Sequence, residues 1–161
     1  MRERRLYLVC GLPGAGKTTR VRQLVQATGA LPLYADEWVS ALGFSLLDYD
    51  FRIKLQACLL QHARQLLRQG VSVVIEFGSW SRTEREGIRQ VAQHEGATTE
   101  LHFLNAPLDE LVRRVRQRGG PEAEVLASRV LLQESGKFEP PAPEEIARFD
   151  RYVGPDAAGP T

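Results

Sequence analysis

The chain has 161 residues, of which 43% are hydrophobic and 25% are charged, and this composition is ordinary for one globular domain with its own core. Its 21 basic and 20 acidic residues nearly balance, so net charge gives no guide to partners, and a nucleic-acid binder would need a local basic patch. No apolar run reaches transmembrane length, and the two cysteines predict neither a disulfide framework nor a metal site. We expect a cytoplasmic protein without a membrane span.

The first motif along the chain is a predicted phosphate-binding loop. Residues 11–18, GLPGAGKT, fit the pattern G-x-x-x-x-G-K-[ST] at every fixed position. The apolar residues 6–10 predict a buried strand before the loop, and residues 17–28 predict a helix after it, ended by Gly29. A simple glycine-rich turn between a strand and a helix is the alternative. The complete spacing and both flanks favour the phosphate loop.

In such a loop the backbone N–H groups converge on phosphate oxygens, and the N-terminus of the following helix favours negative charge. Lys17 is expected to reach the β- and γ-phosphates of a nucleotide, and the Thr18 hydroxyl is expected to hold Mg²⁺. The predicted nucleotide-binding residues are Gly11, Pro13, Gly14, Ala15, Gly16, Lys17, Thr18 and Thr19.

An acidic pair, Asp36-Glu37, follows a second short strand that is predicted over residues 31–35. Open α/β sheets bind ligands at the carboxyl ends of their strands. Asp36 is therefore a candidate general base, which would accept the proton of an attacking hydroxyl. The alternative is that Asp36 caps a helix that starts near Glu37, and the two roles are compatible.

A short helical segment is predicted next, over residues 38–44. Its large apolar side chains, Trp38, Leu42 and Phe44, are candidates for lining a substrate pocket. Aromatic residues at this spacing belong more often to the hydrophobic core, and we expect that here. A long amphipathic helix is then predicted from about residue 48 to residue 69.

The strongest strand pattern covers residues 71–77, which are β-branched and nearly continuous, as in a central parallel strand. Glu76 lies at its carboxyl end, where phosphate-loop enzymes commonly carry an acid that orients Mg²⁺ through bound water. Aspartate is the usual residue there. The longer glutamate leaves open whether it contacts metal, water or substrate. The three histidines are scattered along the chain and predict no metal site.

The next helix begins with a capping-box pattern, in which Ser81 is followed three residues later by Glu84. Arg82 and Arg85 lie in its first turn, where the helix dipole disfavours cations. They either face an anionic ligand or belong to a solvated helix face, and the sequence favours neither interpretation. A fourth strand is predicted over residues 100–104.

Four arginines crowd the end of a helix that starts near Pro107, directly before a Gly-Gly pair: Arg113, Arg114, Arg116 and Arg118. A glycine hinge beside several cations favours a mobile lid that closes over a triphosphate. Cations at a helix C-terminus beside a solvated face would explain one or two of them. Since Arg114 and Arg118 share a helix face, we predict that these two point inward.

The rest of the chain is predicted to return from the lid as a helix over residues 121–134. A proline-rich, extended connector follows over 137–143, and a fifth, edge strand lies within 148–153. We expect residues 1–153 to form a single domain. Residues 154–161 are rich in Gly, Ala and Pro and are expected to be a disordered tail.

Together these motifs resemble the small P-loop kinases that include polynucleotide 5′-kinase domains, zeta-toxin-like kinases and chloramphenicol phosphotransferase. The chain is most similar to the AAA_33-like group of predicted bacterial ATP-binding kinases. The resemblance covers about residues 5–153. The blocks that carry it are GLPGAGKTT, Asp36-Glu37, IEFGSWSRTER at 75–85, ELHFLNAPLDELVRRVRQR at 100–118 and FEPPAPEE at 138–145.

The resemblance implies a three-layer α/β/α P-loop NTPase fold, with a five-stranded parallel sheet in the order 2-3-1-4-5 and helices on both faces. It also implies that Asp36 deprotonates the acceptor hydroxyl, that Arg114 and Arg118 are lid arginines, and that the FEPP segment lies near the nucleotide base. The chain departs from the group's pattern at Glu76, where aspartate is usual, and in its short lid segment, 119–122.

We therefore expect an ATP- and Mg²⁺-dependent phosphotransferase that moves the γ-phosphate to a hydroxyl of an acceptor, with a small molecule slightly favoured over a polynucleotide 5′ end. The alternative is an ATP-hydrolysing or ATP-binding switch module without a phosphoryl acceptor. Oligomeric state is left open. The residues expected to carry the reaction are Lys17, Asp36, Arg114 and Arg118, with Thr18 and Glu76 for the metal.

Overall fold

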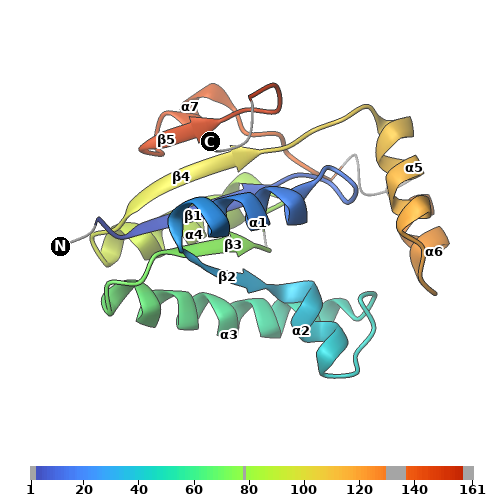
Figure 1. Ribbon diagram of the computed structural model, residues 1–161, viewed down its shortest axis with the longest axis horizontal. Coiled ribbons are helices and arrows are strands. Elements are labelled where there is room, and N and C mark those ends of the chain that lie inside the picture. The colour runs from blue at the N-terminus through green and yellow to red at the C-terminus, as the bar shows by residue number, and fades with distance from the viewer. Residues whose placement is uncertain (1–2, 78, 130–136, 158–161) are drawn as a thin grey trace.

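The computed structural model describes residues 3–77, 79–129 and 137–157. Its centre is a five-stranded sheet in the order β2-β3-β1-β4-β5, and every pair of neighbouring strands is parallel (Figure 1). This confirms the predicted fold class and strand order. The strands are β1 (Arg5–Cys10), β2 (Leu31–Tyr34), β3 (Val73–Glu76), β4 (Thr98–Phe103) and β5 (Arg151–Val153).

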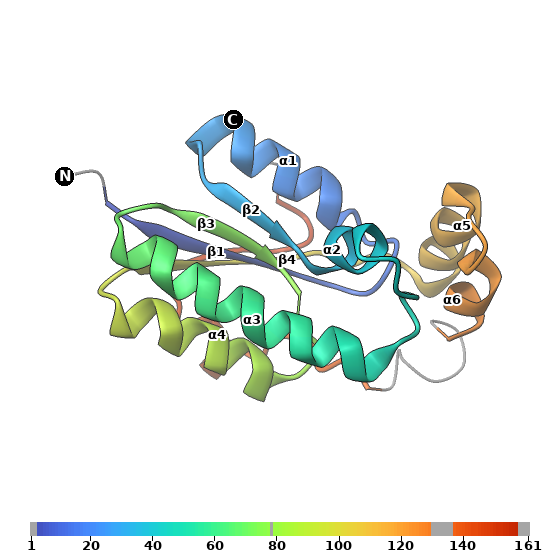
Figure 2. The same cartoon turned by 90° about the horizontal axis from the view of Figure 1, so that it is seen from below.

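Helices cover both faces of the sheet and so form the predicted three layers. Figure 2 shows α1 (Lys17–Thr28) on one side of the sheet, and α3 (Tyr49–Arg68) and α4 (Arg82–His94) on the other. The shorter helices are α2 (Ala35–Ala41), α5 (Leu108–Arg118), α6 (Ala123–Arg129) and α7 (Pro143–Ile146). The first three of these lie beyond the carboxyl ends of the strands (Figure 1). Within the part of the chain described here, no helix has both the length and the apolarity that a membrane crossing requires.

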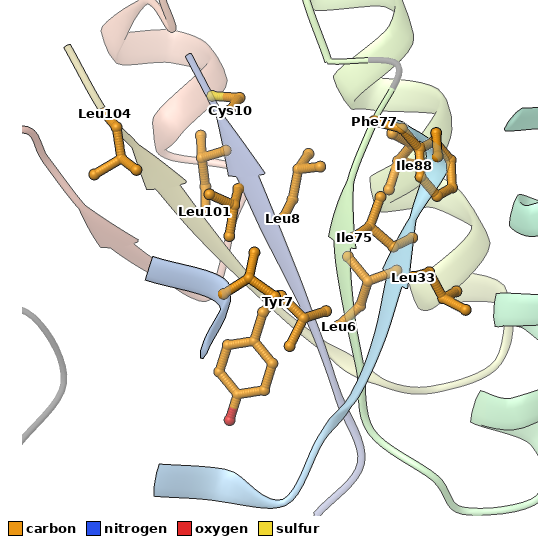
Figure 3. Packing of buried hydrophobic residues seen from close by; sticks show 14 of the residues in the cluster. Leu6, Tyr7, Leu8, Cys10, Leu33, Ile75, Phe77, Ile88, Leu101 and Leu104 are labelled. Carbon is orange, nitrogen blue, oxygen red and sulfur yellow. The ribbon is translucent and has the colours of Figure 1, made fainter. Parts of the chain in front are cut away.

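The middle strands are buried because helices shield them from both sides. Leu6 and Leu8 of β1, Ile75 of β3 and Leu101 of β4 have no exposed surface, and Figure 3 shows their side chains packed side by side. Such near-continuous apolar strands are typical of a parallel sheet between two helical layers. The predicted phosphate loop thus directly follows a central strand that is buried on both faces.

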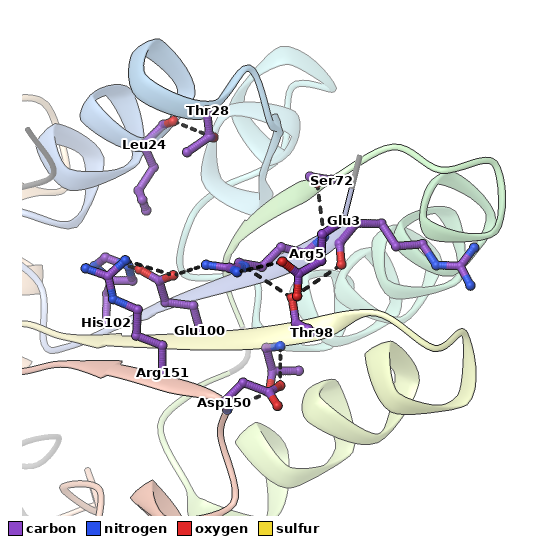
Figure 4. A network of polar contacts seen from close by, with 12 residues as sticks. Glu3, Arg5, Leu24, Thr28, Ser72, Thr98, Glu100, His102, Asp150 and Arg151 are labelled. Carbon is purple, nitrogen blue, oxygen red and sulfur yellow. Dashed lines mark hydrogen bonds and ion pairs between the residues drawn. The ribbon is translucent and has the colours of Figure 1, made fainter. Parts of the chain in front are cut away.

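A buried polar network lies between α1 and this sheet. The Nη1 atom of Arg20 is 3.1 Å from Nδ1 of His102. Nε2 of His102 is 2.8 Å from the carboxylate of Glu100 (Figure 4). Because a guanidinium can only donate, Nδ1 of His102 must accept, and the hydrogen of the ring is assigned to Nε2, which donates to Glu100. Arg5 donates to the other oxygen of Glu100 at 3.0 Å. The network joins α1 to β1 and β4.

Several element bounds differ from the sequence predictions. α2 begins at Ala35, directly after β2, so Asp36 lies inside a helix rather than before one. The predicted return helix is described only as α6, and residues 130–136 lie outside the described residues. Of the predicted disordered tail, residues 154–157 form a turn, and Arg20 donates to the carbonyl of Ala157 at 3.4 Å. The remainder of that tail lies outside the described residues.

The network predicts a pH dependence of stability. Burial opposes ionisation of Glu100, but hydrogen bonds from His102 and Arg5 outweigh it, so the pKa of Glu100 is lowered. A carboxylate with a lowered folded-state pKa stabilises the fold above its unfolded pKa, about 4.3, and this stabilisation is lost as the pH falls through the folded value. We expect Glu100→Gln to reduce the free energy of unfolding at pH 7 by about 1–3 kcal/mol and to flatten its fall in acid.

Chemical denaturation followed by circular dichroism at a series of pH values would measure this effect. Glu3→Gln is the matched control, because Glu3 contacts the same Arg5 at 3.3 Å but is exposed. Equal pH profiles for Glu100→Gln and the wild type would contradict the assignment.

Candidate active site

The predicted phosphate loop connects β1 to α1 and is held between two stretches of backbone. A Cβ atom at Gly14 would lie 2.6 Å from the carbonyl oxygen of Leu111, and one at Gly11 would collide with the carbonyl of Leu104. Gly14 also has a φ of 84°, in the left-handed region that favours glycine. The predicted nucleotide-binding residues all lie in this loop or in the first turn of α1: Gly11, Pro13, Gly14, Ala15, Gly16, Lys17, Thr18 and Thr19.

Lys17 folds back onto the loop. Its Nζ donates to the carbonyl oxygens of Gly11 at 2.9 Å and Leu12 at 3.1 Å. Burial is the largest influence on its pKa and lowers it, while the negative charges of Glu76 and Asp36 raise it. The structure thus brings two predicted acids close to the predicted phosphate-binding lysine.

Glu76 ends β3 beside the start of α1. Burial raises the pKa of Glu76, the charge of Lys17 and the nearby Thr18 hydroxyl lower it, and the overall shift is upward. Thr18 and Glu76, the two predicted metal residues, therefore adjoin. A hydroxyl and a carboxylate are oxygen donors of the kind that Mg²⁺ binds beside phosphate oxygens. Among the described residues, no group of three or more His, Cys, Asp or Glu side chains forms an all-protein metal cage.

Asp36 lies in the first turn of α2 and does not cap it. The N-cap is Tyr34, which makes no side-chain capping bond, so the capping interpretation is wrong. The Asp36 carboxylate is 61% exposed and pairs with Nη2 of Arg52 at 3.1 Å. Arg52 also donates to the carbonyl of Leu46 at 3.2 Å. Sequence reasoning missed Arg52, and no local pattern marks it.

The connection from β3 to α4 confirms the predicted capping box. The backbone N–H of Glu84 donates to the Ser81 hydroxyl at 3.1 Å, and the backbone N–H of Ser81 donates to the Glu84 carboxylate at 2.8 Å. Arg82 is exposed, and its backbone N–H donates to the Glu139 carboxylate at 2.8 Å. This bond draws the proline-rich connector to the start of α4.

Arg85 faces neither solvent nor an anionic ligand, which corrects both interpretations of its position. Its side chain is fully buried and binds the buried carboxylate of Glu145 on α7, with one N···O distance of 2.9 Å. It also donates to the carbonyls of Ser79 at 3.0 Å and Trp80 at 3.2 Å. Arg85 therefore fastens the β3–α4 loop to α7.

Phe138 fills the space next to this ion pair. Its ring stacks on Phe103 at 5.9 Å and meets Trp80 edge-on at 6.3 Å. The guanidinium of Arg85 lies 6.0 Å from its centroid. The connector is thus packed against the carboxyl end of β4. Proximity of the FEPP segment to the nucleotide base stays a prediction.

The lid arginines divide into two pairs. Arg113 binds Glu110 of the same helix, and Arg116 binds Glu124 of α6. Arg114 also binds Glu110, at 2.7 Å, but its Nη1 in addition donates to the carbonyl of Gly14 in the phosphate loop at 3.2 Å.

Arg118, at the end of α5, acts on the loop through its charge. It is exposed, and its positive charge contributes to the lowered pKa of Lys17. Arg114 and Arg118 are the two arginines that were predicted to point inward. Arg114 binds the loop itself, and Arg118 influences the loop lysine, Lys17, through its charge.

The expectation that Trp38, Leu42 and Phe44 belong to the core is wrong. Their exposed fractions are 48%, 54% and 46%. α2 is only seven residues long, and it buries Ala35 and Val39 instead. Large apolar side chains that follow the predicted base along the chain are therefore exposed to solvent.

The buried ion pair predicts a large effect on stability. Glu145→Ala would leave the guanidinium of Arg85 buried and without its carboxylate, and we expect a loss of about 3–5 kcal/mol in the free energy of unfolding. Glu144→Ala, which removes an exposed acid from the same turn, is the control. Urea unfolding measures both. Equal midpoints for the two variants would contradict the role of the pair.

Comparison with known proteins agrees with this geometry. A family model described as an AAA domain, AAA_33, matches residues 6–141. The protein named "Probable adenylyl-sulfate kinase" of Aeropyrum pernix is 31% identical over 113 residues, covering 65% of this chain and 60% of that protein. The chain thus spans less than two thirds of that relative. A guanylate kinase of Alkalilimnicola ehrlichii is 29% identical over 149 residues, covering 78% of this chain and 70% of that protein.

Among solved structures, a sugar kinase from Janibacter sp. HTCC2649 superposes with a TM-score of 0.64 and 21% identity, covering 98% of this chain and 88% of the other. At this identity the likeness concerns the fold. It is a P-loop NTPase fold, with the sheet order described above. Since the family model covers most of the residues, the chain belongs to the AAA_33 family.

Proposed function

We propose that the protein is an ATP- and Mg²⁺-dependent phosphotransferase that moves the γ-phosphate of ATP to a hydroxyl group. One observation carries the proposal. Lys17, Glu76 and Asp36 lie near one another at one edge of the sheet, where the negative charge of Asp36 raises the pKa values of both Lys17 and Glu76. The kinase names of the relatives support the same reaction class.

The donor half of the site binds the triphosphate. The loop offers backbone N–H groups, and Lys17 exchanges its bonds to the carbonyls of Gly11 and Leu12 for bonds to phosphate oxygens. The Thr18 hydroxyl would hold Mg²⁺, with Glu76 on the ion or on its bound water. The ion supplies neutralising charge for the phosphates.

The acceptor half binds the hydroxyl. Asp36 accepts its proton while the hydroxyl oxygen bonds to the γ-phosphorus, and the bond from that phosphorus to the β,γ-bridging oxygen breaks, which releases ADP. Arg52, whose Nη2 lies 3.1 Å from the carboxylate of Asp36, orients that carboxylate. Arg114 and Arg118 would neutralise charge on the phosphoryl group during transfer.

The acidic surroundings favour an alcohol over a phosphate as acceptor. Asp36, Glu37 and Glu76 lie near one another, since both Asp36 and Glu37 contribute to the raised pKa of Glu76. A phosphate acceptor needs no base and would be repelled by these carboxylates, whereas an alcohol needs a proton acceptor.

The role of Asp36 is tested by Asp36→Asn, which keeps the shape of the side chain and removes its ability to accept a proton. We expect the rate of acceptor phosphorylation to fall by about 10²–10⁴-fold, with ATP binding unchanged. The control is Glu37→Gln, at the neighbouring exposed acid of the same turn. Transfer of label from γ-labelled ATP to metabolites, antibiotics and 5′-hydroxyl oligonucleotides measures the rate, beside Lys17→Ala as the inactive reference.

Undiminished transfer in Asp36→Asn would show that the base is another group. If water were the only acceptor across the whole panel, the phosphotransferase proposal would be wrong, and a nucleotide-hydrolysing module would replace it.

The lid offers a matched pair of variants. Arg113 and Arg114 both bind Glu110, but Arg114 also reaches the loop. We expect Arg114→Gln to lower kcat by about 100-fold or more, because a donor to the transferring group is lost. Arg113→Gln, which loses an exposed ion pair, should stay within about twofold of the wild type. Equal kcat values for the two variants, from steady-state kinetics, would contradict the assignment.

A further inference from the structure

The acceptor half contains a pair of stacked phenylalanines that the mechanism above does not use. The rings of Phe44 and Phe51 lie 3.8 Å apart with an angle of 9° between their planes. Phe44 follows α2, and Phe51 lies in the first turn of α3. Phe44 is 46% exposed, so much of its ring is available to a ligand. We call these two residues the aromatic pair.

Two contacts tie the segments that carry the aromatic pair to the proposed base and to the proposed lid. Arg52 is the next residue after Phe51, and it binds Asp36 at 3.1 Å. Ser45 is the next residue after Phe44, and its hydroxyl donates to the carboxylate of Glu122, which lies between α5 and α6. The residue after Phe51 thus contacts the proposed proton acceptor, and the residue after Phe44 contacts the segment between α5 and α6.

The pair is also held in place before any ligand binds. The backbone N–H of Phe44 donates to the carbonyl of Val39 at 3.0 Å. The backbone N–H of Phe51 donates to the side chain of Asp48, the N-cap of α3, at 3.0 Å. A rigid aromatic surface loses little conformational entropy on binding and favours flat, apolar partners.

The charges around the aromatic pair limit which kind of acceptor can bind there. Residues 35–54 contain four acidic residues and two basic residues, and one of the basic residues, Arg52, is engaged by Asp36. Glu122 adds a further carboxylate across the gap to the lid. This environment disfavours anionic acceptors, and a polynucleotide 5′ end with its phosphate backbone most of all.

We propose that the aromatic pair is the binding surface for the acceptor, and that the acceptor is a small alcohol with a planar, neutral or cationic ring close to its hydroxyl. The inference rests on the proposed function, whose acceptor half it completes. The ring stacks on Phe44, and the hydroxyl reaches Asp36. Transfer then proceeds as above, with the proton passing to Asp36 and ADP leaving.

The test compares alcohols that differ only in the ring. Benzyl alcohol and cyclohexylmethanol are matched planar and non-planar probes, and glycerol and a 5′-hydroxyl oligonucleotide represent the other acceptor classes. We expect the wild type to have its lowest KM for benzyl alcohol. Phe44→Ala should raise that KM about tenfold, the equivalent of one lost aromatic contact of about 1.4 kcal/mol, and should leave the KM for ATP unchanged.

Two further variants separate binding from folding. Phe44→Tyr keeps the ring and should restore the KM for benzyl alcohol to within about twofold of the wild type. Tyr49→Ala removes a side chain that is 69% exposed in the same region, and it should leave every KM unchanged. A preference of the wild type for glycerol or the oligonucleotide would overturn the proposal, as would an unchanged benzyl alcohol KM in Phe44→Ala.

Calorimetric binding of benzyl alcohol, with a non-hydrolysable ATP analogue present, keeps this proposal separate from the proposed function. Weaker binding in Phe44→Ala without transfer to any alcohol would support the aromatic surface and reject the phosphotransferase. If the protein transfers phosphate to alcohols but its affinity for benzyl alcohol is unchanged in Phe44→Ala, the phosphotransferase is supported and the aromatic surface is rejected.

Discussion

The close approach of the phosphate loop to neighbouring backbone constrains the rest of the site. Gly11 lies against the end of β4, and Gly14 lies against the carbonyl of Leu111 in α5. A side chain at either position would push these elements apart. Because α5 carries Arg114 and Arg118, the packing that shapes the loop also sets the distance from the lid arginines to the phosphates. The same backbone contact between Gly14 and Leu111 therefore positions both the loop and the helix that carries the lid arginines.

Sequence patterns predicted the parts of this structure that depend on neighbours along the chain. The buried strand before the loop, the helix that starts at Lys17 and the capping box of Ser81 and Glu84 all follow from periodicity, glycine placement or a three-residue spacing. The strand order could not be predicted in this way. It depends on hydrogen bonds between distant segments, and it came from the family resemblance instead of from any pattern in the residues.

The residues that the sequence could not place depend on contacts made only in the folded chain. Arg85 was expected to face either an anionic ligand or solvent, because its true partner, Glu145, lies 60 positions away along the chain. Arg52 is ordinary in sequence until the start of α3 meets Asp36. Phe44 has the spacing of a core residue, yet its segment lies beyond the end of β2 and leaves the ring exposed. Burial of a single side chain is a property of the assembled layers, which local periodicity does not report.

The proposed lid contacts both halves of the proposed site, so it would link the binding of the two proposed substrates. Arg114 binds the loop carbonyl of Gly14, and Glu122 accepts a bond from Ser45 beside the aromatic pair. A ligand that draws the lid toward one half also changes its distance from the other half. Thermodynamic linkage then requires reciprocity, so any factor by which a bound nucleotide changes affinity for the acceptor equals the factor by which the acceptor changes affinity for the nucleotide. In the proposed reaction, the short segment between α5 and α6 would therefore couple the binding of the two substrates.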